Sequence, residues 1–485
     1  MRRLLALISL ASAFGPSNVQ AQPPPEVPPT VLTIRPAAEP RPVLKYRVVP
    51  ERITQIPGNA AIFYHRALQM AAERRTRLDA EKKAKQPPGK VEMTDEEVYR
   101  WLELPIGEMP VEPVRSLLET YWRPLDEVAQ GTTRTTCDWE FDRRPEGINL
   151  LLPEIQEMRS LARLVTLRAR LAVVDGKTDE AIHWVETGLV LGRHVGKGPI
   201  VIQALVGIAI DSVMLKVLEE LIQAPGTPSL VWALADRPRP FIDMRESFDA
   251  ERNVLEKEIP GLTELSRGIW GVDQARKFAD ELQRKIFSFE SGKTGGSTSQ
   301  RMAVAAMTAK IYPTARKALI AQGRPEAEIE AMPVVQVASL YSYQEYRRIL
   351  DESYKWMNIP IWQSMGRFDA GKFLKVEEKM VNPLLTMFWS LTPALESARM
   401  ASVRLDRRLD LLQCIEAIRL HAGTHGGQWP ETLDALTDAP APVDPGTNKP
   451  FVYKLEGDSA TITAPVPAGN YYSTYGLRYV LKRAR

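Results

Sequence analysis

The chain has 485 residues, of which 44% are hydrophobic and 25% are charged, and its formal net charge is +3 at pH 7. This composition is ordinary for a globular protein and excludes a chain that is disordered throughout. The small, well-mixed net charge gives no reason to expect nucleic acid as a partner, because proteins that bind nucleic acid concentrate positive charge.

Residues 1–21 have the three-part organisation of a cleavable signal peptide. A basic stub, Arg2-Arg3, precedes an apolar run over residues 4–14 that is too short to span a bilayer stably. Small residues then predict cleavage between Ala21 and Gln22. A retained membrane anchor is the alternative, which the short apolar run disfavours. We therefore expect an exported protein, periplasmic or extracellular, with no transmembrane anchor after cleavage.

The next segment, residues 22–50, is rich in proline. Eight prolines lie between Gln22 and Pro42, and the segment shows almost no periodic apolar pattern. Such sequences favour an extended, polyproline-like conformation. The sequence therefore predicts a proline-rich linker, which serves either to hold the folded body away from the N-terminus or as a simple spacer.

Residues 51–400 are predicted to form a helical body, because apolar residues recur there at helical spacing. Asn59 is expected to cap the first helix, and Thr94 with Glu97 forms a capping box before the second. Pro124 should kink the third helix. The helices expected from the pattern run over residues 60–77, from residue 95, over 114–130 and 152–174, from residue 178, and over 200–222, 241–258, 273–288, 301–322 and 341–356.

A helical hairpin is predicted around the short turn Asp175-Gly176-Lys177-Thr178, where Thr178 is expected to cap the second helix. The hairpin over residues 161–192 resembles a tetratricopeptide hairpin, with Gly176 in the turn and small residues Ala181 and Gly188 on the second helix. The family's large aromatic positions on the first helix are missing, and no second copy follows at its usual period. We expect helical hairpins, loosely tetratricopeptide-like, rather than a repeat array.

The helix expected over residues 200–222 is apolar nearly all round, but Gln203, Asp211 and Lys216 interrupt it. These polar residues favour the central buried helix of a globular body over a membrane span.

Residues 401–485 are predicted to form a small α+β module, with a long helix followed by a β-hairpin. The long helix is expected over residues 393–421. Alternating residues at 451–455 and 460–463 surround the turn Glu456-Gly457-Asp458-Ser459, which is typical of a hairpin. Residues 477–482 also alternate and predict a third strand. The fold class expected for the whole chain is mainly α, a multi-helix body with this C-terminal module.

The run over residues 411–466 resembles the periplasmic head of pilin-like proteins of type II secretion. The matching residues are Gly427-Gln428-Trp429-Pro430 after the long helix, followed by Asp444-Pro445 and the short sheet. Because the chain opens with an ordinary signal peptide and not with a prepilin site, we do not expect it to polymerise as a pilin. Taken whole, it resembles a group of large, exported, uncharacterised bacterial helical proteins with this tail.

The two cysteines, Cys137 and Cys414, lie far apart in a chain expected in an oxidising compartment. A disulfide between them is one possibility, and two free buried thiols are the other. The sequence does not place the two sulfur atoms within bonding distance.

Two sets of side chains raise the question of a metal site. Cys414, His421 and His425 align on a continuous helix, but Gly423 and Gly426-Gly427 are expected to end the helix before His425. A site assembled after the turn is the alternative that the sequence leaves open. His183, Glu186 and His194 lie at helical spacing on the face opposite the apolar side of their helix, so we expect exposed side chains there.

No local catalytic or cofactor-binding motif is found in the sequence, so no catalytic residue is predicted and no cofactor is expected. We expect a cell-envelope protein with a protein-binding or scaffold role, whose partners are envelope proteins. One alternative is an exported hydrolase or carbohydrate-active enzyme, and another is a secretion-associated accessory protein. The enzyme would gather scattered carboxylates and the aromatic residues Trp101, Trp122, Trp270 and Trp362.

Overall fold

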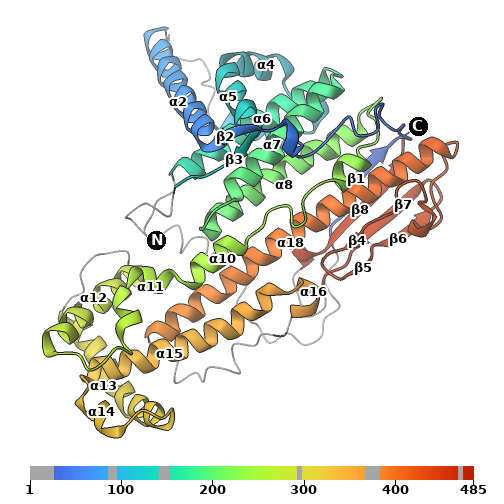
Figure 1. The fold of residues 1–485 in the computed structure, drawn as a ribbon. Coiled ribbons are helices and arrows are strands. Elements are labelled where there is room, and N and C mark those ends of the chain that lie inside the picture. Colours follow the sequence, from blue (N-terminus) through green and yellow to red (C-terminus); the bar gives the residue numbers. More distant parts are fainter. Residues whose placement is uncertain are drawn as a thin grey trace. The chain divides into compact units, whose positions relative to one another are not determined.

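The computed structural model describes residues 27–85, 95–140, 153–291, 298–365, 367, 383–467 and 473–484. The fold is mainly α-helical with a small sheet that includes the C-terminal strands, as predicted (Figure 1). The predicted signal peptide and its cleavage point between Ala21 and Gln22 lie outside the described residues. The chain divides into a larger unit (Pro23–Phe141, Leu151–Ser247 and Met400–Arg485) and a smaller one that includes Phe248–Arg399.

The larger unit begins its helices where the sequence predicts. Asn59 Oδ1 accepts a hydrogen bond from the Ala61 backbone N–H at 3.1 Å, which confirms Asn59 as the cap of the first helix. The capping residue expected for the second helix, Thr94, lies outside the described residues. The helices of the unit are α2 (Ala60–Lys85), α3 (Asp95–Glu103), α4 (Val111–Thr120), α5 (Trp122–Thr132), α6 (Pro153–Val174), α7 (Thr178–Gly196), α8 (Val201–Gln223) and α9 (Val231–Ala235).

The helix expected over residues 114–130 is two helices and not one kinked helix. Tyr121 separates α4 from α5, with backbone angles outside the helical region. Pro124 lies in the first turn of α5, where the missing N–H of proline leaves no hydrogen bond unmade. The proline therefore begins a helix here instead of bending one.

The predicted helical hairpin is formed by α6 and α7. Gly176 adopts a positive φ of 70°, and Lys177 N–H donates to Ala172 O at 2.9 Å, which closes the C-terminus of α6. Lys177, and not Thr178, occupies the N-cap position of α7, and no side chain caps that helix end. Helix α8 then packs against α7 at a close approach, where a Cβ on Gly207 would lie 2.4 Å from the Gly192 carbonyl oxygen.

Helix α8 is the only helix of the described residues that is long and apolar enough to cross a membrane by length and composition. Most of its residues are nevertheless buried inside the structure. Gln203 and Asp211 are fully buried, and Gln203 Nε2 donates to Lys197 O at 2.8 Å. The arrangement agrees with the expected central helix of a globular body.

Helices are the regular secondary structure of the smaller unit in its described residues. Trp270 packs edge-on against Phe278 with ring centroids 5.1 Å apart, and its backbone N–H donates to Gln336 Oε1 at 3.0 Å. Helix α15 starts earlier than expected, at Val334, with Pro333 at its N-cap position. The helices of the unit are α11 (Val254–Glu258), α12 (Val272–Ser291), α13 (Thr298–Ala321), α14 (Glu326–Ala331), α15 (Val334–Tyr354) and α16 (Ile361–Ser364).

Two helices contain residues of both units, α10 (Arg245–Arg252) and the long α18 (Pro383–Thr424). The second covers the helix predicted over residues 393–421 and extends it at both ends. The boundary predicted at residues 400 and 401 falls inside α18, close to the division between the units. The residues after it, which contain the C-terminal α+β module, belong to the same compact unit as residues 23–141 and 151–247.

The C-terminal sheet has four strands in the order β1-β8-β7-β6. The predicted hairpin and third strand are confirmed, and Gly457 takes a φ of 58° in the two-residue turn of the hairpin. The strands are β1 (Thr30–Ile34), β6 (Val452–Glu456), β7 (Ser459–Ala464) and β8 (Leu477–Arg483). Two short pairs stand apart from this sheet, β2 (Ile56–Asn59) with β3 (Arg134–Thr136) and β4 (Val443–Asp444) with β5 (Lys449–Pro450).

The linker predicted over residues 22–50 is not an extended spacer where the structure describes it. Thr30–Ile34 forms β1, which pairs in parallel with β8. Leu32 and Ile34 are each 2% exposed, whereas Val31 is 49% exposed, so one face of the strand is buried. The prolines lie outside this five-residue stretch, where they do not interrupt the ladder.

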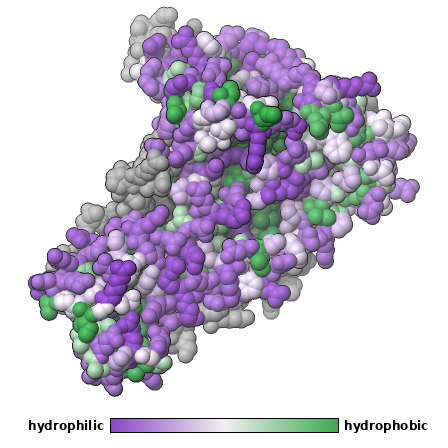
Figure 2. All heavy atoms as spheres, in the orientation of Figure 1, coloured by the Kyte–Doolittle hydropathy of each residue, from purple (hydrophilic) through white to green (hydrophobic). Residues whose placement is uncertain are grey.

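Polar residues cover most of the face drawn in Figure 2, and apolar residues form small scattered groups on it. This distribution is usual for a protein whose apolar side chains are mostly buried.

Candidate functional site

The C-terminal half of α18 carries an unusual number of polar side chains for a buried helix. Asp410 is 3% exposed and Glu416 is fully buried, although carboxylates are seldom buried without a partner. The buried polar residues of this half are Ser402, Asp406, Arg407, Asp410, Gln413, Glu416, Arg419 and His421. Many of their partners come from segments far away in the sequence. Several segments of the larger unit are therefore bound to this one helix.

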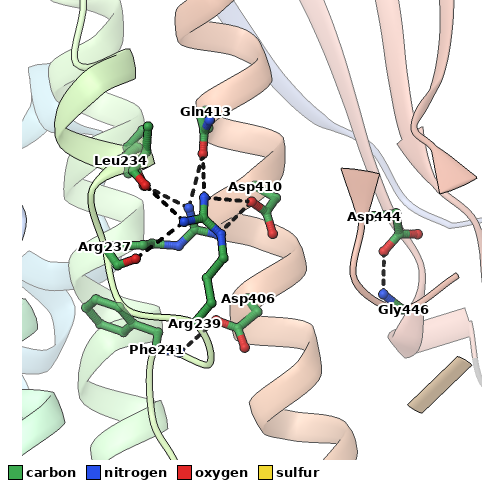
Figure 3. A network of polar contacts seen from close by, with 10 residues as sticks. Leu234, Arg237, Arg239, Phe241, Asp406, Asp410, Gln413, Asp444 and Gly446 are labelled. Atoms are coloured by element: carbon green, nitrogen blue, oxygen red, sulfur yellow. Dashed lines mark hydrogen bonds and ion pairs between the residues drawn. The ribbon is translucent and has the colours of Figure 1, made fainter. Parts of the chain in front are cut away.

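The first group of partners lies in the segment between α9 and α10 (Figure 3). Arg237 Nη2 lies 2.6 Å from Asp410 Oδ1, and both side chains are buried. Gln413 Oε1 accepts hydrogen bonds from Arg237 Nη1 at 3.1 Å and Arg239 Nη2 at 3.0 Å. The two arginines therefore fix this segment against α18.

Asp406 lies one turn before Asp410 and binds the same segment through its backbone. Its Oδ1 accepts the Phe241 N–H at 2.9 Å. Burial raises the pKa of Asp406 to about 6, with the Phe241 hydrogen bond acting in the opposite direction. A carboxyl group with such a pKa suits proton transfer, but Asp406 is only 9% exposed and a substrate has little access to it. The Asp406 carboxyl group thus fixes the backbone of the segment between α9 and α10 to α18.

A second anchor joins α18 to β4 and to the turn between β4 and β5. Arg407 Nε and Nη2 each lie 2.7 Å from an oxygen of Asp444, and neither side chain is exposed. Asp444 also organises its own turn, because its carboxylate accepts the Gly446 N–H at 2.8 Å and the Thr447 hydroxyl at 3.1 Å. Arg407 donates further to the carbonyls of Tyr475 and Pro465. The Arg407 guanidinium thus binds three separate segments of the C-terminal module, at Asp444, Pro465 and Tyr475.

A third anchor binds the sheet itself. The Tyr479 hydroxyl on β8 donates to Glu219 Oε1 on α8, and Arg408 Nη2 donates to the same oxygen at 2.7 Å. Burial raises the pKa of the Tyr479 phenol, which stays protonated and remains a donor. The sheet is therefore fixed to both α8 and α18.

The sheet that these anchors hold has β6 as one of its two edge strands. No described strand pairs with β6 on the side away from β7. Alternate residues from Glu456 backward make the ladder bonds to β7, so the backbone N–H and C=O groups of Tyr453 and Leu455 face the open edge. Two exposed apolar residues lie near one end of the strand: Val452 is 58% exposed, and Val443 on β4 is 51% exposed.

The opposite edge of the sheet differs, because Gln223 binds part of it. The outward N–H of Thr33 on β1 donates to Gln223 Oε1 at 2.9 Å, and Arg35 donates to the Gln223 carbonyl at 3.0 Å. The edge at β6 has no described strand on its outer side. We take this edge, with Val443 and Val452, as the candidate functional site and refer to it as the β6 edge.

The two cysteines are free and buried in the structure, which corresponds to the second of the two possibilities. Cys137 follows β3, and Cys414 lies on α18. Burial raises the pKa of both thiols, so neither has the low pKa of a reactive cysteine.

The three side chains considered for a metal, Cys414, His421 and His425, do not meet. Cys414 lies seven residues before His421, about 10 Å along the helix axis, and the described residues contain no group of three suitable ligands. As expected, the helix ends before His425: α18 runs to Thr424, although the His425 N–H still donates to His421 O at 3.0 Å. The two histidines therefore remain on one face.

The side chains of the second set, His183, Glu186 and His194, lie in different environments. His183 is exposed, as expected. His194 is not a free surface side chain, because its Nδ1 lies 2.7 Å from the hydroxyl of the buried Tyr64. Burial, with nearby Arg193 and Lys197, lowers the pKa of His194 to about 3, and burial raises the pKa of Glu186 to about 7.

The four tryptophans named for an enzyme site divide between the two units. In the larger unit Trp101 is buried and Trp122 is exposed. In the smaller unit Trp270 is buried against Phe278 and Trp362 is exposed. Within each unit these residues show no shared site.

Sequence reasoning missed most of the residues that make up the anchors. Asp406 and Asp410 stand one helical turn apart in a segment with apolar neighbours, which is the available signal, but such a pair is equally typical of an exposed helix face. The partners Arg237 and Glu219 are too distant in sequence to be inferred from spacing. Asp444, with Gly446 and Thr447 beside it, was marked through the resemblance to pilin-like heads.

Comparisons with protein-family models, with curated proteins and with solved structures find no match to this chain. The description of the fold and of the β6 edge therefore rests on this structure alone.

Proposed function

We propose that this protein is an exported cell-envelope protein with a protein-binding or scaffold role, and that the β6 edge is its binding surface. The observation that carries the proposal is the unpaired backbone of β6 beside the exposed side chains of Val443 and Val452. An open edge of this kind accepts an extended segment of another protein as an additional strand.

The anchors on α18 support this role because they make the edge rigid. A preformed binding strand loses little conformational entropy when a partner is added, and its affinity is correspondingly higher. Tyr453 on β6 itself donates from its hydroxyl to Pro430 O at 3.0 Å, in the turn that follows α18. Strand β6 is thus fixed by β7 and by the Tyr453 hydrogen bond, while its outer backbone groups remain unpaired.

The proposal is tested by affinity capture from a bacterial envelope extract with matched variants of the full chain. Val452→Lys places a charge at the edge, where lysine discourages strand addition. Ile62→Lys is the control, because Ile62 on α2 is equally exposed at 57% and lies away from the sheet. We expect the unchanged chain and Ile62→Lys to capture the same protein and Val452→Lys to lose it.

A second variant separates backbone pairing from a side-chain contact. Leu455→Pro removes an N–H that faces the open edge and leaves the ladder between β6 and β7 intact. Binding should fall in this variant while the circular dichroism spectrum stays unchanged. Equal capture by all variants contradicts the proposal.

A further inference from the structure

A buried carboxyl group without a hydrogen-bond partner lies where α7 and α8 meet. Asp211 on α8 has no exposed surface, and neither oxygen of its side chain has a hydrogen-bond partner among the described residues. An ionised carboxylate in such a place is strongly destabilising, because it loses its hydration and gains no donor in exchange. The protonated, uncharged acid is therefore the form that suits this position.

The Asp211 carboxyl group lies directly against the backbone of α7. A Cβ on Gly192 would collide with Asp211 Oδ1, so the carboxyl group fills the space that a larger residue in α7 would need. Burial in this contact raises the pKa of Asp211 well above its ordinary value.

The charged groups that face Asp211 come from α7 and α18. The positive charge of Arg193, which follows Gly192 on α7, lowers the pKa of Asp211, and the negative charge of Asp406 on α18 raises it. Arg408 of α18 also approaches α8, but its Nη1 donates to the Ser212 carbonyl at 2.9 Å.

The other elements packed against α8 supply no free cation at this level. On α6, Arg170 binds Glu220, which lies about two and a half turns beyond Asp211. Strand β1 carries no charged residue. Within the described part of the chain, Arg193 is thus the cation whose charge acts on Asp211.

Arg193 is bound elsewhere in the structure, to Phe241 in the segment between α9 and α10. Its Nε donates to the Phe241 carbonyl at 3.0 Å, and its guanidinium lies over the Phe241 ring, 5.3 Å from the centroid. The Phe241 N–H donates to Asp406 Oδ1 at 2.9 Å. The buried Phe241 is therefore held from α7 through its carbonyl and from α18 through its N–H.

We propose that Asp211 and Arg193 form a buried proton switch that controls how firmly the segment between α9 and α10 is held. While Asp211 keeps its proton, Arg193 binds Phe241. When the proton passes to the solvent, the carboxylate attracts Arg193, which leaves the Phe241 carbonyl and ring. The segment then depends on its contacts with α18 alone and becomes more mobile.

Infrared spectroscopy of the full chain with ¹³C-labelled aspartate detects the proton itself. We expect a protonated carboxyl band at about pH 8, where Asp406, with a pKa of about 6, is already ionised. The band should disappear at higher pH and be absent from Asp211→Asn. Asp434→Asn is the control, because Asp434 is exposed, and it should keep the band. If the unchanged chain shows no such band, the proposal is wrong.

Hydrogen exchange over residues 241–247, read by mass spectrometry and corrected for the intrinsic effect of pH, measures the segment. Below the pH at which the band disappears, the unchanged chain and Asp211→Asn should exchange equally. Above it, the unchanged chain should exchange at least about fivefold faster, because asparagine does not ionise and Arg193 stays on Phe241. Arg193→Met should exchange fast on both sides, without a step.

An unchanged chain whose exchange shows no step at the pH where the band disappears overturns the proposal, whether or not the variants fold. Equal exchange in the unchanged chain and Asp211→Asn on both sides overturns it as well. The switch goes beyond the binding role proposed for the β6 edge, and its test uses different residues and a different readout.

Discussion

At the scale of single residues, Arg407 and Asp444 show how a buried ion pair fixes one part of the chain to another. Arg407→Met should lower the free energy of unfolding by about 3–5 kcal/mol, because Asp444 is left buried without its cation. The double variant Arg407→Met/Asp444→Asn should lose less, since the amide carries no charge. Urea unfolding of the three proteins measures the difference, and a loss below about 1 kcal/mol in the single variant contradicts the interpretation.

Asp406 gives a prediction about pH. Its folded-state pKa of about 6 is above the value of about 3.9 in the unfolded chain, so the folded protein binds more protons between these values. The Asp406 contribution to stability therefore falls as the pH rises from 4 to 6. Asp406→Asn lacks this dependence and still accepts the Phe241 N–H.

The stability of Asp406→Asn relative to the unchanged chain should rise by about 2–3 kcal/mol between pH 4 and pH 7. Urea unfolding of both proteins at several pH values measures this difference. A difference that is flat with pH would mean that Asp406 titrates normally in the folded state.

At the scale of elements, the approach of α7 and α8 depends on two glycines. A Cβ on Gly207 would collide with the Gly192 carbonyl, which is backbone and cannot turn aside. Gly207→Ala should destabilise the protein by about 1–3 kcal/mol. Gly107→Ala is the control, because a Cβ there meets nothing within 4 Å, and its effect should stay within about 0.5 kcal/mol. Thermal unfolding compares the two, and equal effects would exclude the close approach.

A prediction at β1 distinguishes two interpretations of residues 30–34, a packed strand and an unpaired linker. Leu32→Ala removes a buried side chain and should cost about 2–5 kcal/mol, whereas Val31→Ala, at the exposed neighbouring position, should cost less than about 1 kcal/mol. Urea unfolding measures both. If neither substitution changes stability, residues 30–34 form a linker as the prolines suggest.

The elements also show how far sequence reasoning reaches. Helices such as α6 and the hairpin of β6 and β7 were predicted because their apolar spacing and turn residues are local signals. Strand β1 was missed, although Val31 and Thr33 alternate with Leu32 and Ile34, because the surrounding prolines dominate the segment. Its partner β8 is more than 400 residues away, and no local pattern specifies a pairing over such a distance.

At the scale of the whole molecule, little of the candidate site could be predicted from the sequence. The pilin-like resemblance marked the segment that contains Asp444 and Val452, but an open edge exists only once the strand order of the sheet is known. The same holds for the anchors, whose partners are brought together by folding. The predicted helical architecture is confirmed, and the envelope role remains a proposal.

Photo-crosslinking tests the β6 edge most directly. A photoreactive amino acid is placed at Val452 or, as a control, at Ile62, and the full chain is irradiated in the bacterial envelope. We predict a discrete crosslinked envelope protein from position 452 that is absent from position 62 and is lost when Leu455→Pro is added. No product at position 452, or the same products at both positions, would contradict a binding role for this edge.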